Sequence, residues 1–570
     1  MNVRDSEEVL GMLRAQGYEI AEEPEAADVI LLNTCSVRQH AEERAFGKMG
    51  ELSVLKQERP DLVLGIIGCM AKLRQAEIFK RLPRVDLVAG PAELYDLPYL
   101  LAEIQEQRQQ AELVQGAGLG VGGNNGLPRT PNPEPRTRVI AVDRPYRPLE
   151  KKPAGDYRRD RVTAFVTIME GCDKACTYCI VPKTRGQEIS RPAEEIIEEI
   201  NRLVEAGYRE VTLLGQNVNS YGKRFPDGSG YKGPLGRLRL LEEDPGALLD
   251  FPQLLRLIDA SIQGLAGPAT APPHASSPRR TIAVVGSGRM GALAPCHPPG
   301  LRIRFTTSHP FDATERLFAA MRDCPSVCEA LHLPVQSGSN RILRAMRRGY
   351  TAEAYLRKIE RLRQLVPEVS LSTDIIVGFP GETDEDFEAT VRLMREARYD
   401  NAYIFKYSPR PGTDAAARED DVPQEAKEER NQVLLKLQEE ITLARHRALE
   451  GCLVEILVEQ RGRFEGQWFG RTRGHHGVIV ESPEDLLGKL VQAKIARGTA
   501  HTLFGSLHGA ADHRARRPDG GGEVRRRGGA GAVVGGGDRL LRFDAGLPED
   551  AGPLAGPHPR PAGASPTPPH

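Results

Sequence analysis

The sequence predicts an α/β protein made of several domains, with a small β-barrel and a disordered tail near its C-terminal end. Its 570 residues exceed what a single hydrophobic core usually holds. Short β-branched-rich apolar runs alternate with charged helical stretches over most of the chain, which is typical of parallel sheets and (β/α) barrels. The pattern then changes to short strands with Gly-rich breaks, and finally to a stretch rich in Gly, Pro and Arg.

The first predicted domain spans residues 1–110 and places two thiols at one edge of a sheet. Its strand candidates, residues 28–33 and 62–67, lead into Cys35 and Cys69. Open α/β sheets bind ligands at the carboxyl ends of their parallel strands. We therefore expect both thiols to lie at a ligand-binding edge.

The central domain is predicted over residues 158–440 as a partial or full (β/α) barrel. It follows residues 111–157, whose Gly, Pro, Asn and Arg content favours an irregular linker. The predicted barrel strands are residues 164–169, 210–214, 303–307, 330–333, 371–377 and 402–405.

The C-terminal part divides into a barrel and a tail. Residues 441–505 contain strand-like runs at 453–458 and 477–480 with Gly-rich breaks, which predict a small all-β barrel. Residues 506–570 bury too little apolar surface to offset the entropy lost on ordering, so we predict that they are disordered.

Charge and cysteine usage indicate a cytoplasmic protein. The formal net charge of -1 gives no global signature of nucleic-acid binding, so any RNA contact needs a local basic patch. The first residues lack the apolar core of a secretory signal, and no run approaches eighteen apolar residues, so we predict no membrane span. In a reducing compartment, clustered cysteines indicate metal or catalytic sites before disulfides.

The strongest motif is MEGCDKACTYCIVPKTRG, which carries Cys172, Cys176 and Cys179 in C-x3-C-x2-C spacing. Three thiolates on one loop can bind three irons of a [4Fe–4S] cluster and leave the fourth iron open. S-adenosylmethionine (SAM) can bind there through its amino and carboxylate groups and accept an electron, which yields a 5′-deoxyadenosyl radical. A structural zinc loop is the alternative, but zinc usually takes a fourth Cys or His, and none lies within ten residues on either side. Tyr178 could flank the adenine of SAM or simply pack in the loop.

The cysteine motif and several further segments resemble the methylthiotransferases of the radical SAM superfamily. Among these enzymes they are most similar to the branch that acts on dimethylallyl-modified adenosine in tRNA. The similarity covers most of residues 1–505, and GRTRG and IARGTAHTLFG near its end resemble the TRAM module, a small RNA-binding β-barrel. The choice of branch depends mainly on Gln216–Asn217–Val218–Asn219. The other matching segments are LLNTCSVR, GIIGCMA, RFTTSHP, LHLPVQSGSNRILRAMRRGYT and STDIIVGFPGETDEDF.

The resemblance implies an enzyme with two [4Fe–4S] clusters and SAM as cofactors. The second cluster, on the N-terminal domain, would carry the sulfur that is methylated and inserted at C2 of an isopentenyl-modified adenosine beside the tRNA anticodon. The implied partners are tRNA and an electron donor such as flavodoxin or ferredoxin, and we expect a monomer. Two alternatives stay open: a methylthiotransferase acting on threonylcarbamoyl-adenosine or on a ribosomal protein, and an RNA-binding protein with a crippled sulfur-donor cluster.

The resemblance also assigns candidate contacts. Lys183 and Arg185, after the cysteine loop, are candidates for phosphate contacts. Some further residues are candidates for contacts with SAM, and for each of them a role in a turn or helix cap is an equal alternative. Others are candidates for contacts with RNA, and for these the alternative is a solvated charged face. The SAM candidates are Gln216, Asn217, Gln336, Ser337, Gly378 and Glu382, and the RNA candidates are Arg471, Arg473, His475 and Trp468.

The chain departs from the family in two places. The family holds its N-terminal cluster with three cysteines, and here only Cys35 and Cys69 match, because the sequence begins within the segment that would carry the first. We therefore expect an unstable second cluster, or a true start further upstream. Residues 263–300 stand where the family runs directly from a helix into a strand, and they are interpreted as an insertion.

Overall fold

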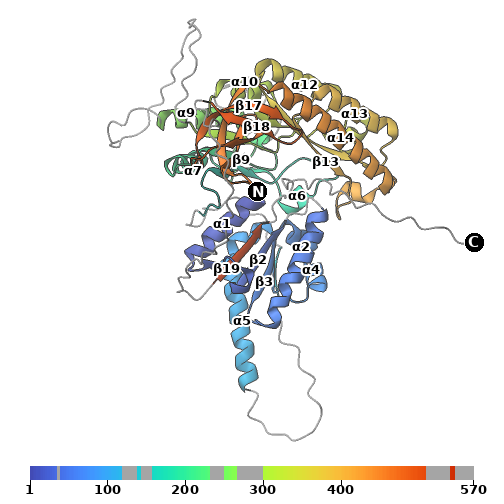
Figure 1. The fold of residues 1–570 in the computed structure, drawn as a ribbon. Helices are drawn as coiled ribbons and strands as arrows, with labels where there is room; N and C mark the ends of the chain where they lie inside the picture. Colours follow the sequence, from blue (N-terminus) through green and yellow to red (C-terminus); the bar gives the residue numbers. More distant parts are fainter. Residues whose placement is uncertain are drawn as a thin grey trace, which may run out of the picture.

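The computed structural model describes residues 1–34, 39–117, 138–142, 157–230, 249–265, 300–508 and 540–545. The N-terminal sheet and its helices form one part of the molecule, and the central strands, their helices and the C-terminal barrel form a second part beside it (Figure 1). No helix in these ranges is long and apolar enough to cross a membrane.

The N-terminal domain is a parallel sheet in the order β1-β19-β2-β3-β4-β5. Its strands are β1 (Glu19–Ile20), β2 (Val29–Thr34), β3 (Val63–Gly68), β4 (Leu87–Ala89), β5 (Val139–Ala141) and β19 (Leu540–Ala545). Its helices are α1 (Asn2–Ala15), α2 (Gln39–Leu52), α3 (Cys69–Arg74), α4 (Ala76–Arg81) and α5 (Leu97–Ala117).

Alternate residues of the N-terminal strands supply two separate cores. In β2, Ile30 and Leu32 pack with residues of α2 and α4, whereas Val29 and Leu31 face the core formed with α1 and α5. This alternation follows from the two-residue period of a strand. Because both faces are covered, the strands are apolar throughout, as the sequence predicts.

Two of these strands correct expectations from the sequence. β5 lies inside residues 111–157, which were predicted as linker, and pairs in parallel with β4. β19 lies inside the tail predicted to be disordered, and it pairs in parallel with both β1 and β2. Its sequence, LLRFDA, is an apolar run in a tail that is otherwise rich in Gly, Pro and Arg, and so it suits a strand. The other residues between 509 and 570 lie outside the described ranges.

The central domain contains all six predicted strands as two parallel sheets, β6-β9-β10 and β11-β12-β13. Isolated bridges from Ile303 to Val327 and from Gln336 to Ile375 continue the pairing around a partial barrel. The strands are β6 (Thr163–Thr167), β9 (Glu210–Leu214), β10 (Arg302–Phe305), β11 (Ala330–His332), β12 (Ser370–Val377) and β13 (Asn401–Lys406). The helices are α6 (Val181–Thr184), α7 (Ala193–Glu205), α9 (Phe251–Leu265), α10 (Glu315–Asp323), α11 (Asn340–Ala345), α12 (Ala352–Leu365), α13 (Asp384–Ala397) and α14 (Gln424–Ala448).

The C-terminal module is a closed five-stranded barrel in the order β14-β15-β16-β18-β17, which confirms the predicted small β-barrel. Its strands are β14 (Leu453–Arg461), β15 (Gln467–Thr472), β16 (Gly477–Glu481), β17 (Leu490–Gly498) and β18 (Leu503–Leu507). Helix α14 leads directly into it and packs against both β13 and β17. Most of the predicted insertion, residues 266–299, lies outside the described ranges.

Candidate active site

The cysteine loop begins where β7 (Met169–Glu170) ends and is held closed by the strand that returns beside it. β7 pairs with β8 (Ile189–Ser190) in antiparallel orientation, and the amide of Cys172 donates to the carbonyl of Gly186 at 3.1 Å. Gly171 has a φ of +74°, and a Cβ there would collide with the carbonyl of Gln187. Only glycine fits this turn without displacing the neighbouring chain.

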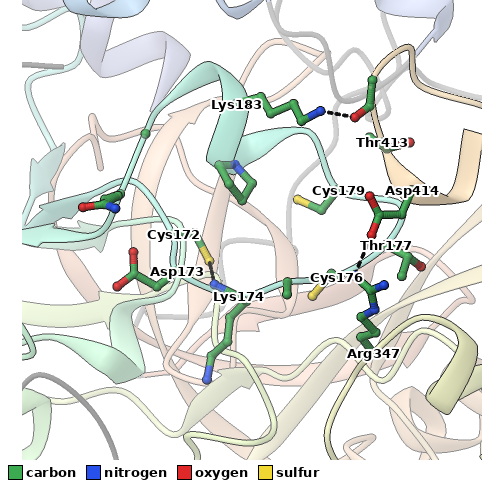
Figure 2. Close-up of a pocket in the computed structure, with 15 residues that line it drawn as sticks. Cys172, Asp173, Lys174, Cys176, Thr177, Cys179, Lys183, Arg347, Thr413 and Asp414 are labelled. Atoms are coloured by element: carbon green, nitrogen blue, oxygen red, sulfur yellow. Dashed lines mark hydrogen bonds and ion pairs between the residues drawn. The ribbon is translucent and has the colours of Figure 1, made fainter. Parts of the chain in front are cut away.

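The three thiols of the loop face one cavity of about 470 Å³ (Figure 2). All three are half-buried and free. Burial raises the pKa of Cys172 to about 12 and that of Cys179 to about 11, so both are protonated in the metal-free chain at neutral pH. Iron binding must therefore release protons from them. The cavity is lined by Cys172, Asp173, Lys174, Ala175, Cys176, Thr177, Cys179, Pro182, Lys183, Gly186, Gln187, Arg347, Gly412, Thr413 and Asp414.

The donor set fits an iron–sulfur cluster better than a single ion. Three soft thiolates placed around a volume match the three protein ligands of an open [4Fe–4S] cluster. In the part of the chain that the structure describes, no three His, Cys, Asp or Glu side chains converge on a point where one metal ion could bind.

Two residues that the sequence did not single out contact Cys176. Arg348 Nη1 lies 3.2 Å from its Sγ, and His309 Nε2 lies 3.9 Å from it. Burial, with the nearby charge of Arg348, holds the pKa of His309 far below its usual range, so this imidazole is neutral. Both residues come from elements far from the loop in sequence, so spacing could not reveal them.

A group of buried polar atoms near the loop has no hydrogen-bond partner among the described residues. These atoms are both carboxylate oxygens of Glu188, Oε1 of Gln216, both amide atoms of Asn219 and the hydroxyl of Ser308. The Ser220 hydroxyl lies close enough to lower the pKa of Glu188, but it donates to the carbonyl of Asn217. Burial is the larger effect and raises the pKa of Glu188 to about 7. Since unsatisfied buried polar atoms are costly, these residues fit a polar ligand such as SAM.

The other predicted SAM contacts have roles within the protein. Asn217 accepts from the amide of His309 at 3.0 Å and donates to Asp312 at 2.7 Å, so it ties the loop after β9 to the loop after β10. Ser337 is buried and accepts from the amide of Ser339 at 3.1 Å, while Ser339 caps α11. Neither these candidates nor the residues with unsatisfied polar atoms line the cavity that the thiols face.

Near β12, two more of these candidates form a turn. Glu382 accepts from the amide of Gly378 at 2.6 Å and pairs with Arg430 at 2.8 Å. Gly378 has a φ of +70°, and a Cβ there would meet the side chain of Lys427. For these two residues the alternative weighed from the sequence, a turn role, describes the observed contacts.

Comparisons with known proteins cover most of the chain. The uncharacterized protein family UPF0004 matches residues 1–90, the radical SAM superfamily matches residues 166–394 and the TRAM domain matches residues 447–508. A tRNA-2-methylthio-N(6)-dimethylallyladenosine synthase from Carboxydothermus hydrogenoformans is 41% identical over 512 residues, which are 89% of this chain and 97% of the relative. The chain belongs to this family of synthases. A relative of the same name from Opitutus terrae is 40% identical over 90% of this chain and 97% of its own length.

Among solved structures, the radical SAM methyltransferase TsrM from Kitasatospora setae is a distant neighbour. It covers 68% of this chain and 65% of its own, with a TM-score of 0.40 and 16% identity. For a member of the synthase family, the matched radical SAM domain implies a [4Fe–4S] cluster and SAM, which agrees with the cysteine loop and its cavity.

In this synthase-family chain, the N-terminal domain packs directly against the cysteine loop. Helix α3, which begins at Cys69, contacts α6, the helix that follows the loop. Arg185, at the end of α6, donates to Asp5 of α1. Cys35 lies outside the described residues. The geometry therefore places one predicted ligand of the second cluster beside the radical SAM site.

The predicted phosphate contact of Arg185 is corrected by these interactions, whereas that of Lys183 stays a prediction. Arg185 is 4% exposed and engaged with Asp5, so it is not available to RNA. Lys183 is bonded to the carbonyl of Gly412 at the rim of the cavity (Figure 2). Both cations hold the loop in the fold.

The predicted RNA contact of Trp468 in the barrel is also corrected, while those of Arg471, Arg473 and His475 stay predictions. Trp468 is 3% exposed, packs in the barrel core and donates to the carbonyl of Ser482 at 3.3 Å, so it cannot stack on a base. Arg471 pairs with Glu459. Arg473 pairs with Glu329 of the central domain at 2.7 Å.

The carbonyls of these two arginines also take part in docking. Arg302 donates to the carbonyl of Arg471 at 2.8 Å, and Arg304 donates to that of Arg473 at 2.7 Å. The cluster therefore docks the barrel onto the central domain, and only His475, at the turn between β15 and β16, is exposed.

Proposed function

We propose that this protein adds a methylthio group to C2 of N6-isopentenyl-adenosine beside the anticodon of tRNA. One observation carries the proposal: the 41% identity to a relative named for this activity extends over 97% of that relative. The structure adds a cysteine loop whose thiols face one cavity, as a radical SAM site requires. The family match to TRAM, a module associated with RNA, is consistent with a tRNA substrate.

In this proposal Cys172, Cys176 and Cys179 hold the catalytic [4Fe–4S] cluster, and Glu188, Gln216, Asn219 and Ser308 receive the polar groups of SAM. When bound, cluster and SAM supply one-electron chemistry that makes an unreactive aromatic C–H bond reactive. The orphaned carboxylate of Glu188 suits the cationic amino group of SAM, because an opposite charge would satisfy it. Tyr178 remains a candidate for the adenine.

The second cluster, on Cys35 and Cys69, belongs to the proposal as the sulfur donor. The contact between α3 and α6 supports it, because sulfur transfer needs a donor held close to the activated carbon. Two full clusters contain about eight irons, so iron and sulfide quantification on the reconstituted chain tests for the second cluster.

We further propose that tRNA contacts the outer face of β17 and β18. Lys494 and Arg497 are exposed there and have no ion pair among the described residues. Arg497 lies 4.6 Å from the ring centroid of Phe504, which faces it from β18. Unpaired cations beside an aromatic ring suit the phosphates and bases of RNA.

The remaining elements of the proposal follow from the substrate and the chemistry. Modification of tRNA places the protein in the cytoplasm. A low-potential one-electron protein such as flavodoxin or ferredoxin would reduce the cluster, and the chain would act as a monomer.

Mass spectrometry of tRNA nucleosides tests the function. A bacterial strain lacking its own enzyme for this step should regain methylthio-isopentenyl-adenosine when it expresses this chain, and should not regain it with Cys176→Ala. Methylthio-threonylcarbamoyl-adenosine in place of the expected product would assign the other tRNA substrate. If neither product appears and the reconstituted protein releases no 5′-deoxyadenosine from SAM, the radical SAM proposal is wrong.

A further inference from the structure

Arg348 is a buried cation next to one of the three loop thiols. It follows α11, and its side chain is 5% exposed. Its guanidinium contacts four groups: Cys176 Sγ at 3.2 Å, the Tyr178 hydroxyl at 3.3 Å, the Tyr350 hydroxyl at 2.9 Å and the Pro334 carbonyl at 2.9 Å. No carboxylate within the described residues forms an ion pair with it.

A buried guanidinium without a carboxylate needs another anion, because burying an unpaired charge is costly. Its other hydrogen-bond partners are the hydroxyls of Tyr178 and Tyr350 and the carbonyl of Pro334, and none of these is a carboxylate. The remaining candidate anion is the sulfur of Cys176 in its iron-bound, thiolate form.

The three thiols of the loop have different donors. Cys172 accepts from the backbone amide of Lys174 at 3.5 Å, and the amide of Val181 hydrogen-bonds to Cys179. Cys176 instead faces the full positive charge of Arg348. Backbone amides follow from the loop itself, whereas Arg348 is supplied by a segment 172 residues further along the chain.

We propose that Arg348 is a positioning residue that raises the reduction potential of the radical SAM cluster by placing its charge against Cys176. The inference depends on the cluster assigned under the proposed function. A [4Fe–4S] core of charge +2 with three thiolates carries a net charge of about −1, and one electron from the protein donor brings it to about −2. A nearby cation stabilises the more negative state more strongly, and burial weakens the screening of that charge.

The test is an EPR-monitored redox titration of the reconstituted full-length chain without SAM. The chain carries Cys69→Ala, so that only the cluster on the loop contributes to the spectrum. Arg348→Gln should shift the midpoint to a more negative potential, and Arg348→Lys, which keeps the charge, should stay closer to the parent. Arg344→Gln is the matched control, because this exposed arginine of α11 loses the same charge away from the cavity.

Each outcome decides the inference. An unshifted midpoint in Arg348→Gln with normal iron content overturns it, and so does a shift that appears only when SAM is added, because Arg348 would then act on the SAM carboxylate. If Arg348→Gln assembles no cluster, the Arg348→Lys variant decides. A cluster in Arg348→Lys supports a role of the positive charge. Loss of the cluster in Arg348→Lys as well shows that the shape of the guanidinium matters and overturns the inference. If the parent chain itself binds no iron, the proposed function fails together with the inference.

Discussion

The cysteine loop and the C-terminal barrel each contain a cluster of residues that predicts binding. In the structure the two clusters have opposite surroundings. The three thiols of the loop remain half-buried around one cavity, where a ligand can reach them. The basic and aromatic cluster in and just after β15 is engaged within the protein: Trp468 lies in a core and Arg473 pairs with Glu329.

The difference lies in the partners that the fold supplies. Arg471 of β15 and Arg473 just after it pair with glutamates, whereas Arg348 beside Cys176 faces no carboxylate among the described residues. A charged residue that the protein already neutralises holds domains together. A buried charge that the protein leaves unbalanced marks a place for a ligand or cofactor.

The largest effect that would test this comparison is removal of a loop thiol. Cys176→Ala should abolish release of 5′-deoxyadenosine from SAM, with a loss of roughly three orders of magnitude or more, because the cluster loses one of its three protein ligands. Product quantification by liquid chromatography checks it. Cys452→Ala is the control, since this exposed cysteine lies far from the loop in sequence. Comparable loss in both variants would contradict the special role of the loop.

Trp468→Ala tests the buried side of the comparison. Removing a fully packed indole should destabilise the barrel by about 3–5 kcal/mol and lower its melting temperature. Thermal unfolding followed by far-ultraviolet circular dichroism, a signal of the backbone, measures the melting temperature. The exposed Phe464→Ala change should have little effect on melting. A stable Trp468→Ala protein that has lost only RNA affinity would restore the stacking interpretation.

Acid should weaken the docking of the barrel. Burial lowers the pKa of His476, near Asp400 of the central domain, to about 4 from an ordinary value of 6.5. Between pH 6.5 and pH 4 the His476 imidazole is therefore protonated more readily in the unfolded chain than in the folded one. The folded state loses stability as the pH falls through this range. From pH 7 to pH 5 the loss should be about 2 kcal/mol. Melting temperatures measured across this range should decline more steeply for the parent than for His476→Gln. Parallel curves would refute the assignment.

The smallest effect concerns the face of β17 and β18. Lys494→Ala with Arg497→Ala should weaken tRNA binding by roughly tenfold and reduce the salt dependence by about two phosphate contacts, without changing the melting temperature. Filter binding over a salt series measures both quantities. Lys436→Ala, an exposed lysine on α14, provides the control. Unchanged affinity in the double variant would remove this surface from the proposal.

Sequence patterns predicted the regular elements well because their signals are local. The run Glu210–Leu214 is a strand with the bounds that the apolar pattern predicts, and the other five central strands agree to within two residues. Prediction failed where a short strand depends on a distant partner. β5 and β19 are isolated in sequences rich in Gly, Pro and Arg, and only pairing with β4, β1 and β2 makes them strands.

The sequence by itself determined the loop chemistry, because C-x3-C-x2-C places three thiols on one short segment whatever surrounds it. Tertiary structure alone decided which charges remain available. Arg473 meets Glu329 across 144 positions, and Arg348 meets Cys176 across 172. Electrostatic energy depends on distance in space and on burial, neither of which residue spacing over such separations reveals.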